Sequence, residues 1–403
     1  MLDSYIIRED YLNKLIAFKD KNVIKVITGV RRCGKSTLLE MYAEYLLNNN
    51  VRQDQIIFIN LEDYDFSDLR EPKVLHEYVK QRLIPNQKVY IFIDEIQNCE
   101  DFPLVVDSLF IKKNTDIYLT GSNAYMLSTE IATHLSGRYV ELPMLPLSFK
   151  EYELSQGTTN NNLSVSYLKY ISTSSFPYAL ELKGQENELK NYLEGVYNTI
   201  IIKDVINRIK ITDIMMFKSI TQFIFHNIGS LLSTKKIADT MVSNGRKIDV
   251  RTVEKYIHGL SESFIIYQAK RYNIKGREFL KTLDKYYVVD IGLRNMLISS
   301  RSLDVGHMLE NVVYLELLRR GYKVYVGKVD DLEVDFVAIN HKEIFYVQVA
   351  ASVRDPQTLE RELASLKKIN DNYPKLILTL DEDPDTDYNG ILRINALNWL
   401  IAK

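Results

Sequence analysis

The 403-residue sequence has few of the features that mark secreted, membrane or metal-binding proteins. Its two cysteines, Cys33 and Cys99, do not have the spacing of a metal site, and such low cysteine usage is typical of a reducing compartment. No apolar run approaches the length of a membrane-spanning helix, and no basic-then-apolar signal pattern is present at the start. We therefore expect a cytoplasmic protein with no membrane segment.

The sequence also lacks an excess of charge of either sign. Lys and Arg total 51 and Asp and Glu total 53, so the formal net charge is -2. This balance excludes a global attraction to nucleic acid or to a membrane surface, and any such surface must be local. The chain is too long for one ordinary hydrophobic core, and its 46% hydrophobic content is that of a soluble protein with several domains.

The sequence does contain a phosphate-binding loop. Residues 29–36, GVRRCGKS, match G-x-x-x-x-G-K-[ST], follow a β-branched run and precede an expected helix, TLLEMYAEYLL, as strand–loop–helix requires. The glycines let backbone N–H groups face one concavity, while the lysine can reach the β- and γ-phosphates and the serine hydroxyl can bind Mg²⁺. The predicted nucleotide-binding residues are Gly29, Arg31, Arg32, Cys33, Gly34, Lys35, Ser36 and Thr37.

A second motif supplies carboxylates. Residues 89–93 form a continuous apolar run, typical of a buried parallel strand, and Asp94 and Glu95 follow it directly. A carboxylate at the carboxyl end of a strand beside the phosphate loop can hold the Mg²⁺ shell, which suits Asp94. Glu95 is then placed to polarise the attacking water.

Two further polar positions have alternative interpretations. The strand at 116–123 ends in Ser122 and Asn123, and either residue could contact the γ-phosphate or orient the water; a helix cap would use the same residue types. We interpret Asn123 as a catalytic residue. Arg138, which follows Gly137, could stabilise transition-state charge in its own site or in that of a neighbouring subunit, or form a surface salt bridge.

The pattern of elements predicts the domains. Strands and helices alternate through residues 1–150, which predicts an α/β fold with a parallel sheet. Residues 151–215 are mainly helical and are expected to form a lid or linker. Residues 216–300 read as helix, turn, helix and hairpin, the pattern of a winged helix. Within 246–285, ten Lys and Arg stand against five Asp and Glu, which favours DNA contact, although winged helices also bind proteins.

Residues 301–403 form a third kind of unit, a small α/β domain. Glu310 on a helix, Asp335 on a strand and Gln348 on the paired strand could together hold a metal for phosphodiester cleavage. A lysine would be expected two residues after Gln348, and this chain has Ala350 there. We therefore expect a degenerate nuclease-like site.

Nearly the whole chain resembles a bacterial and archaeal family of AAA+-type P-loop ATPases with a C-terminal domain of unknown function. The resemblance implies an ATPase core that uses ATP and Mg²⁺, a winged helix and a tail with the restriction-endonuclease-like PD-(D/E)XK fold. It also implies Lys35, Ser36, Asp94 and Glu95 as nucleotide-site residues and Arg138 as an arginine finger. The stretches that carry it are TGVRRCGKSTLL, IFIDEIQ, LTGSN, LSGRYVELPMLPLSFKEY, TVEKYIHGL, FLKTLDKYYVVDIGLRN, EVDF and YVQVA.

These observations favour an ATP hydrolase whose nucleotide state repositions the winged helix and the tail on DNA. A nucleotide-gated protein-interaction switch is the main alternative, and an ATP-dependent nuclease is a third. The expected partners are ATP, DNA, and a second copy of the chain or another protein. Nuclease activity is not expected, because the tail lacks its usual lysine.

Overall fold

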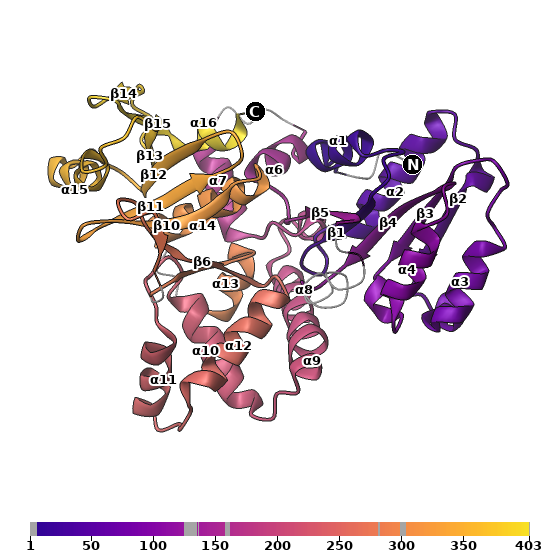
Figure 1. Cartoon of the computed structure of the whole chain (residues 1–403). Helices are drawn as coiled ribbons and strands as arrows, with labels where there is room; N and C mark the ends of the chain where they lie inside the picture. The colour runs from indigo at the N-terminus through magenta and orange to yellow at the C-terminus, as the bar shows by residue number, and fades with distance from the viewer. Residues whose placement is uncertain are drawn as a thin grey trace. The chain divides into compact units, whose positions relative to one another are not determined.

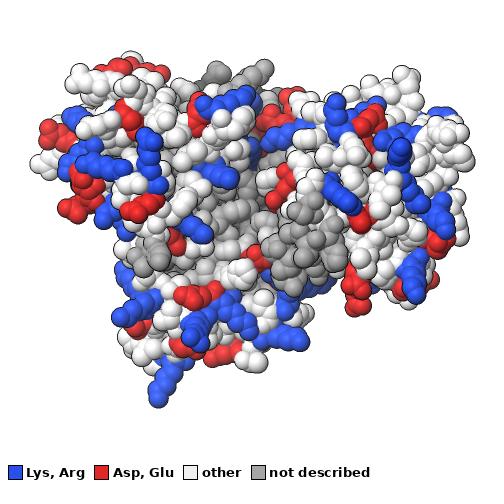
Figure 2. Space-filling view, in the orientation of Figure 1, with Lys and Arg blue, Asp and Glu red and all other residues white. Residues whose placement is uncertain are grey.

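The computed structural model describes residues 6–124, 135, 137–157, 162–280, 283–298 and 304–402 (Figure 1). The chain forms two compact units. The N-terminal unit contains Met1–Pro146 with Glu262–Phe264, and the C-terminal unit contains Leu147–Ser261 with Ile265–Lys403. Positive and negative side chains are interspersed over the face that Figure 2 shows, in keeping with the small net charge.

The N-terminal unit is built on a five-stranded parallel sheet with the order β2-β3-β4-β1-β5. Its strands are β1 (Ile24–Thr28), β2 (Ile56–Asn60), β3 (Val89–Asp94), β4 (Thr115–Gly121) and β5 (Tyr139–Pro143). Every residue of β1, β3 and β4 is buried, as in the centre of a parallel sheet, and the two charged residues among β1 and β4, Lys25 and Asp116, form a buried ion pair. The fold is thus the parallel α/β sheet expected from the sequence.

Helices α1 (Glu9–Ala17), α2 (Lys35–Asn48), α3 (Pro72–Lys80) and α4 (Phe102–Phe110) complete this unit. The strand order places β4 between β3 and β1. Because all strands run the same way, the segments that follow β1, β3 and β4 emerge at one edge of the sheet. This edge, the carboxyl edge, is where the predicted site residues are expected to meet.

Helices dominate the first part of the C-terminal unit. They are α6 (Phe149–Ser155), α7 (Leu163–Ser172), α8 (Glu186–Thr199), a π-helical segment (Ile200–Ile206), α9 (Asn207–Ile209), α10 (Ile214–His226), α11 (Thr234–Ser243), α12 (Val250–Glu262) and α13 (Ile291–Leu297). The buried Asp290 caps α13 and also accepts hydrogen bonds from Ser174 and from the amide and hydroxyl of Ser175. The segment predicted to be a lid is therefore part of the same compact unit as the rest of the chain beyond Pro146.

The hairpin after α12 is more elaborate than the two strands expected. Strand β6 (Ile266–Ala269) pairs antiparallel with β9 (Lys285–Val288), and the connection between them forms a second hairpin, β7 (Arg271–Asn273) and β8 (Glu278–Phe279). Strand β7 joins the C-terminal sheet through parallel pairing with β10 (Lys323–Val329). The apolar side chain of Ile274, which is buried in the core of that sheet, explains why the connection leaves the β6–β9 pair.

The C-terminal sheet has eight strands in the order β14-β15-β13-β12-β11-β10-β7-β8. Its remaining members are β11 (Leu332–Ile339), β12 (Ile344–Ala350), β13 (Lys375–Thr379), β14 (Thr386–Asp387) and β15 (Ile391–Asn395). Helices α14 (Val305–Arg319), α15 (Pro356–Lys367) and α16 (Ala396–Ile401) pack on it. No helix in the described ranges is long and apolar enough to span a membrane.

Candidate nucleotide site

The phosphate loop owes its shape to two glycines. Gly29 has φ +152°, and a Cβ there would lie 2.1 Å from the carbonyl oxygen of Met144, so the position accepts no side chain without a shift of the backbone. Gly34 has φ +104° and immediately precedes Lys35, the first residue of α2. The loop therefore closes tightly over the end of β1 and leads directly into a helix N-terminus, the arrangement that suits an anion.

The side chain of Lys35 is buried and folds back against the phosphate loop. Its Nζ donates to the carbonyl oxygens of Gly29 (3.0 Å) and Val30 (3.2 Å), and it lies 3.6 Å from Oε1 of Glu95. Burial alone would lower the pKa of Lys35, but the nearby Glu95 carboxylate raises it overall. The lysine is therefore a held cation beside the predicted catalytic carboxylate.

Asp94 ends β3 and is 2% exposed. The hydroxyl of Thr120 on β4 donates to its carboxylate, and the side chain of Ser36 is also hydrogen-bonded to it. Burial raises the pKa of Asp94, while these two hydrogen bonds oppose the rise. A serine hydroxyl and a carboxylate in contact at the carboxyl edge are hard oxygen ligands, so the residues present fit a Mg²⁺ ion.

Glu95 has a left-handed backbone, with φ +53°, which is uncommon for a residue with a side chain. Its amide donates to Thr120 Oγ1 at 2.8 Å, and the side-chain amide of Gln97 donates to its carboxylate and, at 3.2 Å, to Ser122 Oγ. Burial would raise the pKa of Glu95, but Lys35 and other neighbours lower it overall. An ionised carboxylate, fixed by its backbone and its neighbours, is the form that accepts a proton.

The structure separates the two remaining candidates. Asn123 follows β4 and is buried at the carboxyl edge with the loop, while the neighbouring Ser122 is hydrogen-bonded to Glu95. Arg138 precedes β5 at the opposite, amino edge of the sheet, where it pairs with Asp107. The five-residue strands set it about 15 Å from the loop along the strand direction, so within one chain Arg138 and Lys35 are not brought together.

The outer residues of the loop differ in their surroundings. Arg31 pairs with Glu62 at 2.7 Å, Arg32 is exposed with φ +66°, and Thr37 is half-buried. Cys33 is fully buried, and burial raises the pKa of its thiol despite nearby cations. Because the thiol is protonated and enclosed, Cys33 is best interpreted as a small residue that packs within the loop, and not as a reactive one.

Sequence reasoning missed several residues of this region. Arg8, only 3% exposed, donates to the carbonyl oxygens of Cys33 (3.1 Å), Leu145 (2.8 Å) and Pro146 (3.4 Å). It thus ties the phosphate loop to the last residues before the C-terminal unit. No motif marks Arg8, and Gln97 and Thr120 carry no signal beyond their place near the acidic pair.

In the C-terminal unit, Lys285 on β9 changes the interpretation of the predicted nuclease-like residues. Its Nζ lies 2.8 Å from Glu310, 2.8 Å from Glu333 and 3.1 Å from Asp335. Burial would lower the pKa of Lys285, but these three carboxylates raise it well above 10.5. The structure therefore brings Glu310 and Asp335 together around an ammonium group that comes from another strand.

Gln348 is directed elsewhere. It accepts from the amide of Asp335 at 3.2 Å and donates to Glu362 on α15 at 2.7 Å. Over the described ranges, no group of three or more His, Cys, Asp or Glu residues is arranged to hold a metal ion. The contacts of Gln348 are thus those of a structural link between β11, β12 and α15.

Comparisons with known proteins found two family models and several solved structures that are similar to parts of this chain. A family model described as an AAA domain matches residues 21–153, and a second, described as a domain of unknown function, matches 165–304. Among solved structures, a Walker-type ATPase of Pyrococcus abyssi is 17% identical over 73% of this chain and 96% of its own, with a TM-score of 0.49. The AMPPCP-bound DnaA of Aquifex aeolicus is 16% identical over 65% of this chain and 91% of its own, with a TM-score of 0.32.

Two uncharacterized proteins match most of the sequence. One, from Methanocaldococcus jannaschii, is 30% identical over 94% of this chain and 86% of its own. The other, from Haemophilus influenzae, is 38% identical over 100% of both chains. This chain therefore belongs to the same family as the Haemophilus influenzae protein, and its N-terminal unit is an AAA-type P-loop nucleotide-binding domain.

Proposed function

We propose that this chain is a Mg²⁺-dependent ATPase whose nucleotide state repositions the C-terminal unit, and that this unit acts on DNA. One observation carries the proposal. At the carboxyl edge of the sheet, the Lys35 ammonium lies 3.6 Å from the Glu95 carboxylate, and Ser36 is hydrogen-bonded to Asp94. A phosphate-binding cation, a pair of oxygen ligands and a base are thus concentrated in one place.

Each residue has a role in the proposed reaction. Lys35 exchanges its bonds to the loop carbonyls for the β- and γ-phosphates of ATP. Ser36 and Asp94 hold the Mg²⁺ ion, which, when bound, neutralises phosphate charge. Glu95 accepts a proton from the attacking water, and Gln97 keeps its carboxylate oriented. Asn123, at the same edge, is proposed to contact the γ-phosphate.

The contacts of Arg8 suggest how the loop communicates with the rest of the chain. Its guanidinium joins the carbonyl of Cys33 to those of Leu145 and Pro146, and the chain enters the C-terminal unit at Leu147. A shift of the loop on nucleotide binding would therefore reach the connection between the units. The tie supports a change in unit position that depends on nucleotide state.

Arg138 is proposed to act as a finger in trans. Its side chain is 45% exposed, and its position at the amino edge separates it from the phosphate loop of its own chain. A second copy would have to supply it, which makes hydrolysis depend on protein concentration. Cleavage of DNA is not part of the proposal, because the Lys285 ammonium lies among the carboxylates that would bind the metal.

The test is ATP hydrolysis by the intact chain with Mg²⁺, measured alone and with single- or double-stranded DNA. We expect turnover that falls by two or more orders of magnitude in Lys35→Ala and in Glu95→Gln, while Glu95→Gln still binds ATP. Wild-type turnover no greater than that of Lys35→Ala under all three conditions would refute the proposed ATPase.

A protein-interaction switch is the second candidate function, and the hairpin favours it. In the C-terminal unit, β7 pairs with β10, so part of the predicted wing is used in sheet contacts. Binding to DNA with a steep salt dependence argues for the DNA-acting form, since each phosphate contact releases counterions. Nucleotide-dependent binding of a protein with no DNA affinity at low salt argues for the switch.

A further inference from the structure

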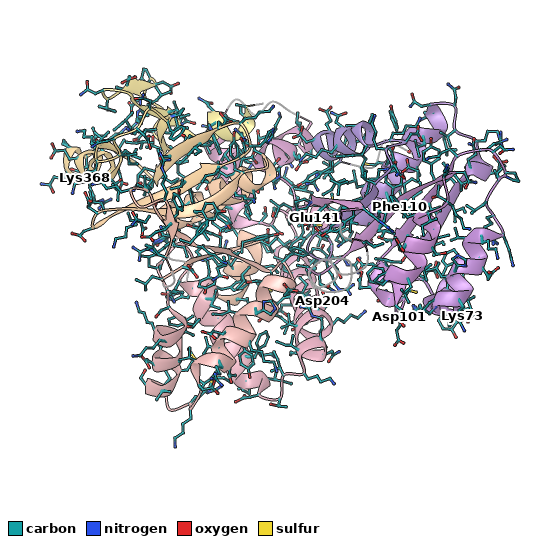
Figure 3. The ribbon with its side chains drawn as sticks, in the orientation of Figure 1. Lys73, Asp101, Phe110, Glu141, Asp204 and Lys368 are labelled. Atoms are coloured by element: carbon teal, nitrogen blue, oxygen red, sulfur yellow. The ribbon has the colours of Figure 1, made fainter. Side chains whose placement is uncertain are left out.

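The C-terminal unit contains a groove of about 490 Å³ that the proposed ATPase chemistry does not use. Strands β11 and β12 form its floor through Val337, Ile339 and Ile344. The β7–β8 hairpin forms one wall, and residues 369–373, which follow α15, form the other. Lys368, labelled in Figure 3, marks the end of α15 beside this second wall. A volume of this size is in the range of pockets that hold small molecules or single residues of a polymer.

Tyrosines are present on both walls and on the floor of the groove. Tyr346 on the floor is 4% exposed, and its hydroxyl donates to Asp371 at 2.6 Å. The ring of Tyr373 lies 6.4 Å from that of Tyr346 and is 41% exposed, so much of its surface is free for a ligand. On the hairpin, Tyr272 is held by packing against Phe279. The groove therefore offers aromatic surface from two sides above an apolar floor.

The hairpin adds positive charge. Its residues 270–280 contain four cations and one acid, in a chain whose net charge is -2. Arg277 and Lys275 line the groove itself. Lys275 is bonded to Asp330 at 2.7 Å, whereas Arg277 is exposed and lies at the turn, where its backbone has φ +52°. Arg277 thus supplies positive charge at the rim, and it is opposed by Asp371 on the other wall, whose carboxylate accepts from the Tyr346 hydroxyl.

Aromatic surface, an apolar floor and cations at the rim are together the chemistry of unpaired nucleotides. Bases of any sequence stack on tyrosine, and the phosphates that connect them pair with arginine and lysine. A double helix keeps its bases paired and stacked inside, so it has no base face to offer such a groove. An apolar peptide would fill the floor but would leave the hairpin charge unmatched.

We propose that this groove binds single-stranded nucleic acid, with a base seated against Tyr373 and the adjoining phosphate on Arg277. This inference rests on the proposed action on DNA. It adds which form of nucleic acid is bound and which surface binds it. It is tested by binding measurements without ATP. A chain that does not hydrolyse ATP can still bind the oligonucleotide, so the two proposals fail in different experiments.

The experiment measures the fluorescence anisotropy of a short fluorescein-labelled oligothymidine on the intact chain. Tyr373→Ala is expected to weaken binding about 5- to 150-fold, the range for loss of one stacked base. Arg277→Ala is expected to weaken it and to reduce the slope of log Kd against log salt by about 0.7, the value for one phosphate contact on a single strand. Tyr373 is 41% exposed and Arg277 is exposed, so the variants should fold.

Matched controls lie on the N-terminal unit. Tyr64 is 85% exposed, and Lys73, labelled in Figure 3, is exposed on α3, so Tyr64→Ala and Lys73→Ala remove a tyrosine and a positive charge from another surface. Binding that both groove variants weaken and both controls leave unchanged supports the proposal. No binding, equal binding by all four variants, or a duplex that competes as well as the single strand would overturn it. The proposal would also be overturned if the chain bound an apolar peptide but not the oligonucleotide, and if that peptide binding depended on Tyr373.

Discussion

Replacing Lys285 with methionine should strongly destabilise the C-terminal unit. Methionine keeps the length and apolar stem of the side chain but removes the ammonium group that lies within 3.1 Å of Glu310, Glu333 and Asp335. The side chains of Glu310 and Asp335 are 7% and 10% exposed, so water cannot replace the lost cation fully. Breaking a buried ion pair from one side costs about 3–5 kcal/mol, and we expect that loss at pH 8.

The loss should depend on pH in a defined direction. Burial raises the pKa of Glu310 to about 7 in the folded chain, against 4.5 for an ordinary glutamate, and the positive charge of Lys285 limits the rise. Without Lys285 the folded pKa of Glu310 increases further, so the folded variant binds more protons than the unfolded one above pH 4.5. Its free energy of unfolding then falls as pH rises, by up to about 1.4 kcal/mol per pH unit for one extra proton.

The wild-type lysine does not obscure this trend. Because the folded pKa of Lys285 is raised above 10.5, its contribution to stability is fully present below pH 10.5 and is lost only at higher pH. Between pH 5.5 and 8 the contribution of the lysine's own titration is therefore constant. Wild-type Glu310 ionises near pH 7, whereas Glu310 of Lys285→Met stays protonated to higher pH. The difference in unfolding free energy between the two proteins should therefore be about 1.4 kcal/mol larger at pH 8 than at pH 5.5.

The chain provides a local probe for this measurement. Its single tryptophan, Trp399, lies on α16 of the C-terminal unit, so urea unfolding followed by tryptophan fluorescence reports on that unit alone. Lys275→Met is the matched control, since it removes a lysine that is paired at 2.7 Å with an exposed Asp330 and should cost below about 1 kcal/mol. Adding Glu310→Gln to Lys285→Met should restore stability and flatten the pH dependence.

Two results would refute the reasoning. A cost below about 1 kcal/mol at pH 8 would mean that Lys285 does not compensate buried carboxylates. A large cost that is the same at pH 5.5 and pH 8 would mean that packing, and not charge, is what the lysine contributes.

Three further predictions concern the N-terminal unit. Thr120→Val removes a hydrogen bond that lowers the pKa of Asp94, so the acidic limb of the ATPase pH–rate profile should move to higher pH. Gly29→Ala should abolish ATP binding in calorimetry, because the new Cβ would meet backbone atoms. The control is Gly195→Ala on α8 of the C-terminal unit, where a Cβ lies in open space; this variant should bind ATP normally, and its free energy of unfolding should rise by about 0.5–1 kcal/mol. Cys33 should resist alkylation by iodoacetamide until urea unfolds the unit, as mass spectrometry of the digested chain would show.

The sequence predicts those parts of the fold and site that depend on short spacing. The phosphate loop and the acidic pair each lie within one strand-to-loop transition, and parallel strands bring the two transitions to one edge whatever the intervening chain does. The contacts of Lys285 could not be predicted in this way. Its partners are 25 to 50 residues away on a helix and another strand, and its own sequence context, a basic hairpin, favours a surface interpretation.

The same limit applies to the predicted domains. A pattern of helices and strands indicates supersecondary units, but whether two such units share a core depends on contacts between them that no local pattern encodes. Residues 216–300 and 301–403 read as separate domains, whereas β7 of the first pairs with β10 of the second. A single apolar residue in the connection, Ile274, gives no sequence signal that distinguishes a free wing from one bound to a sheet.

These contacts determine what a nucleotide-driven movement can carry. Strand β9 is fastened to α14 by the Lys285 cluster, by the stacked rings of Tyr287 and Tyr314 at 4.2 Å, and by two hydrogen bonds between Asn311 and the backbone of Val288. Separating them would break the bonds of Lys285 to its carboxylates and expose these buried charged groups, at a cost well above the few kcal/mol typical of coupling between sites. In the function proposed above, α11, α12, the β6–β9 hairpin and the groove should therefore move as one body, so that DNA bound at one of them would be carried with the others.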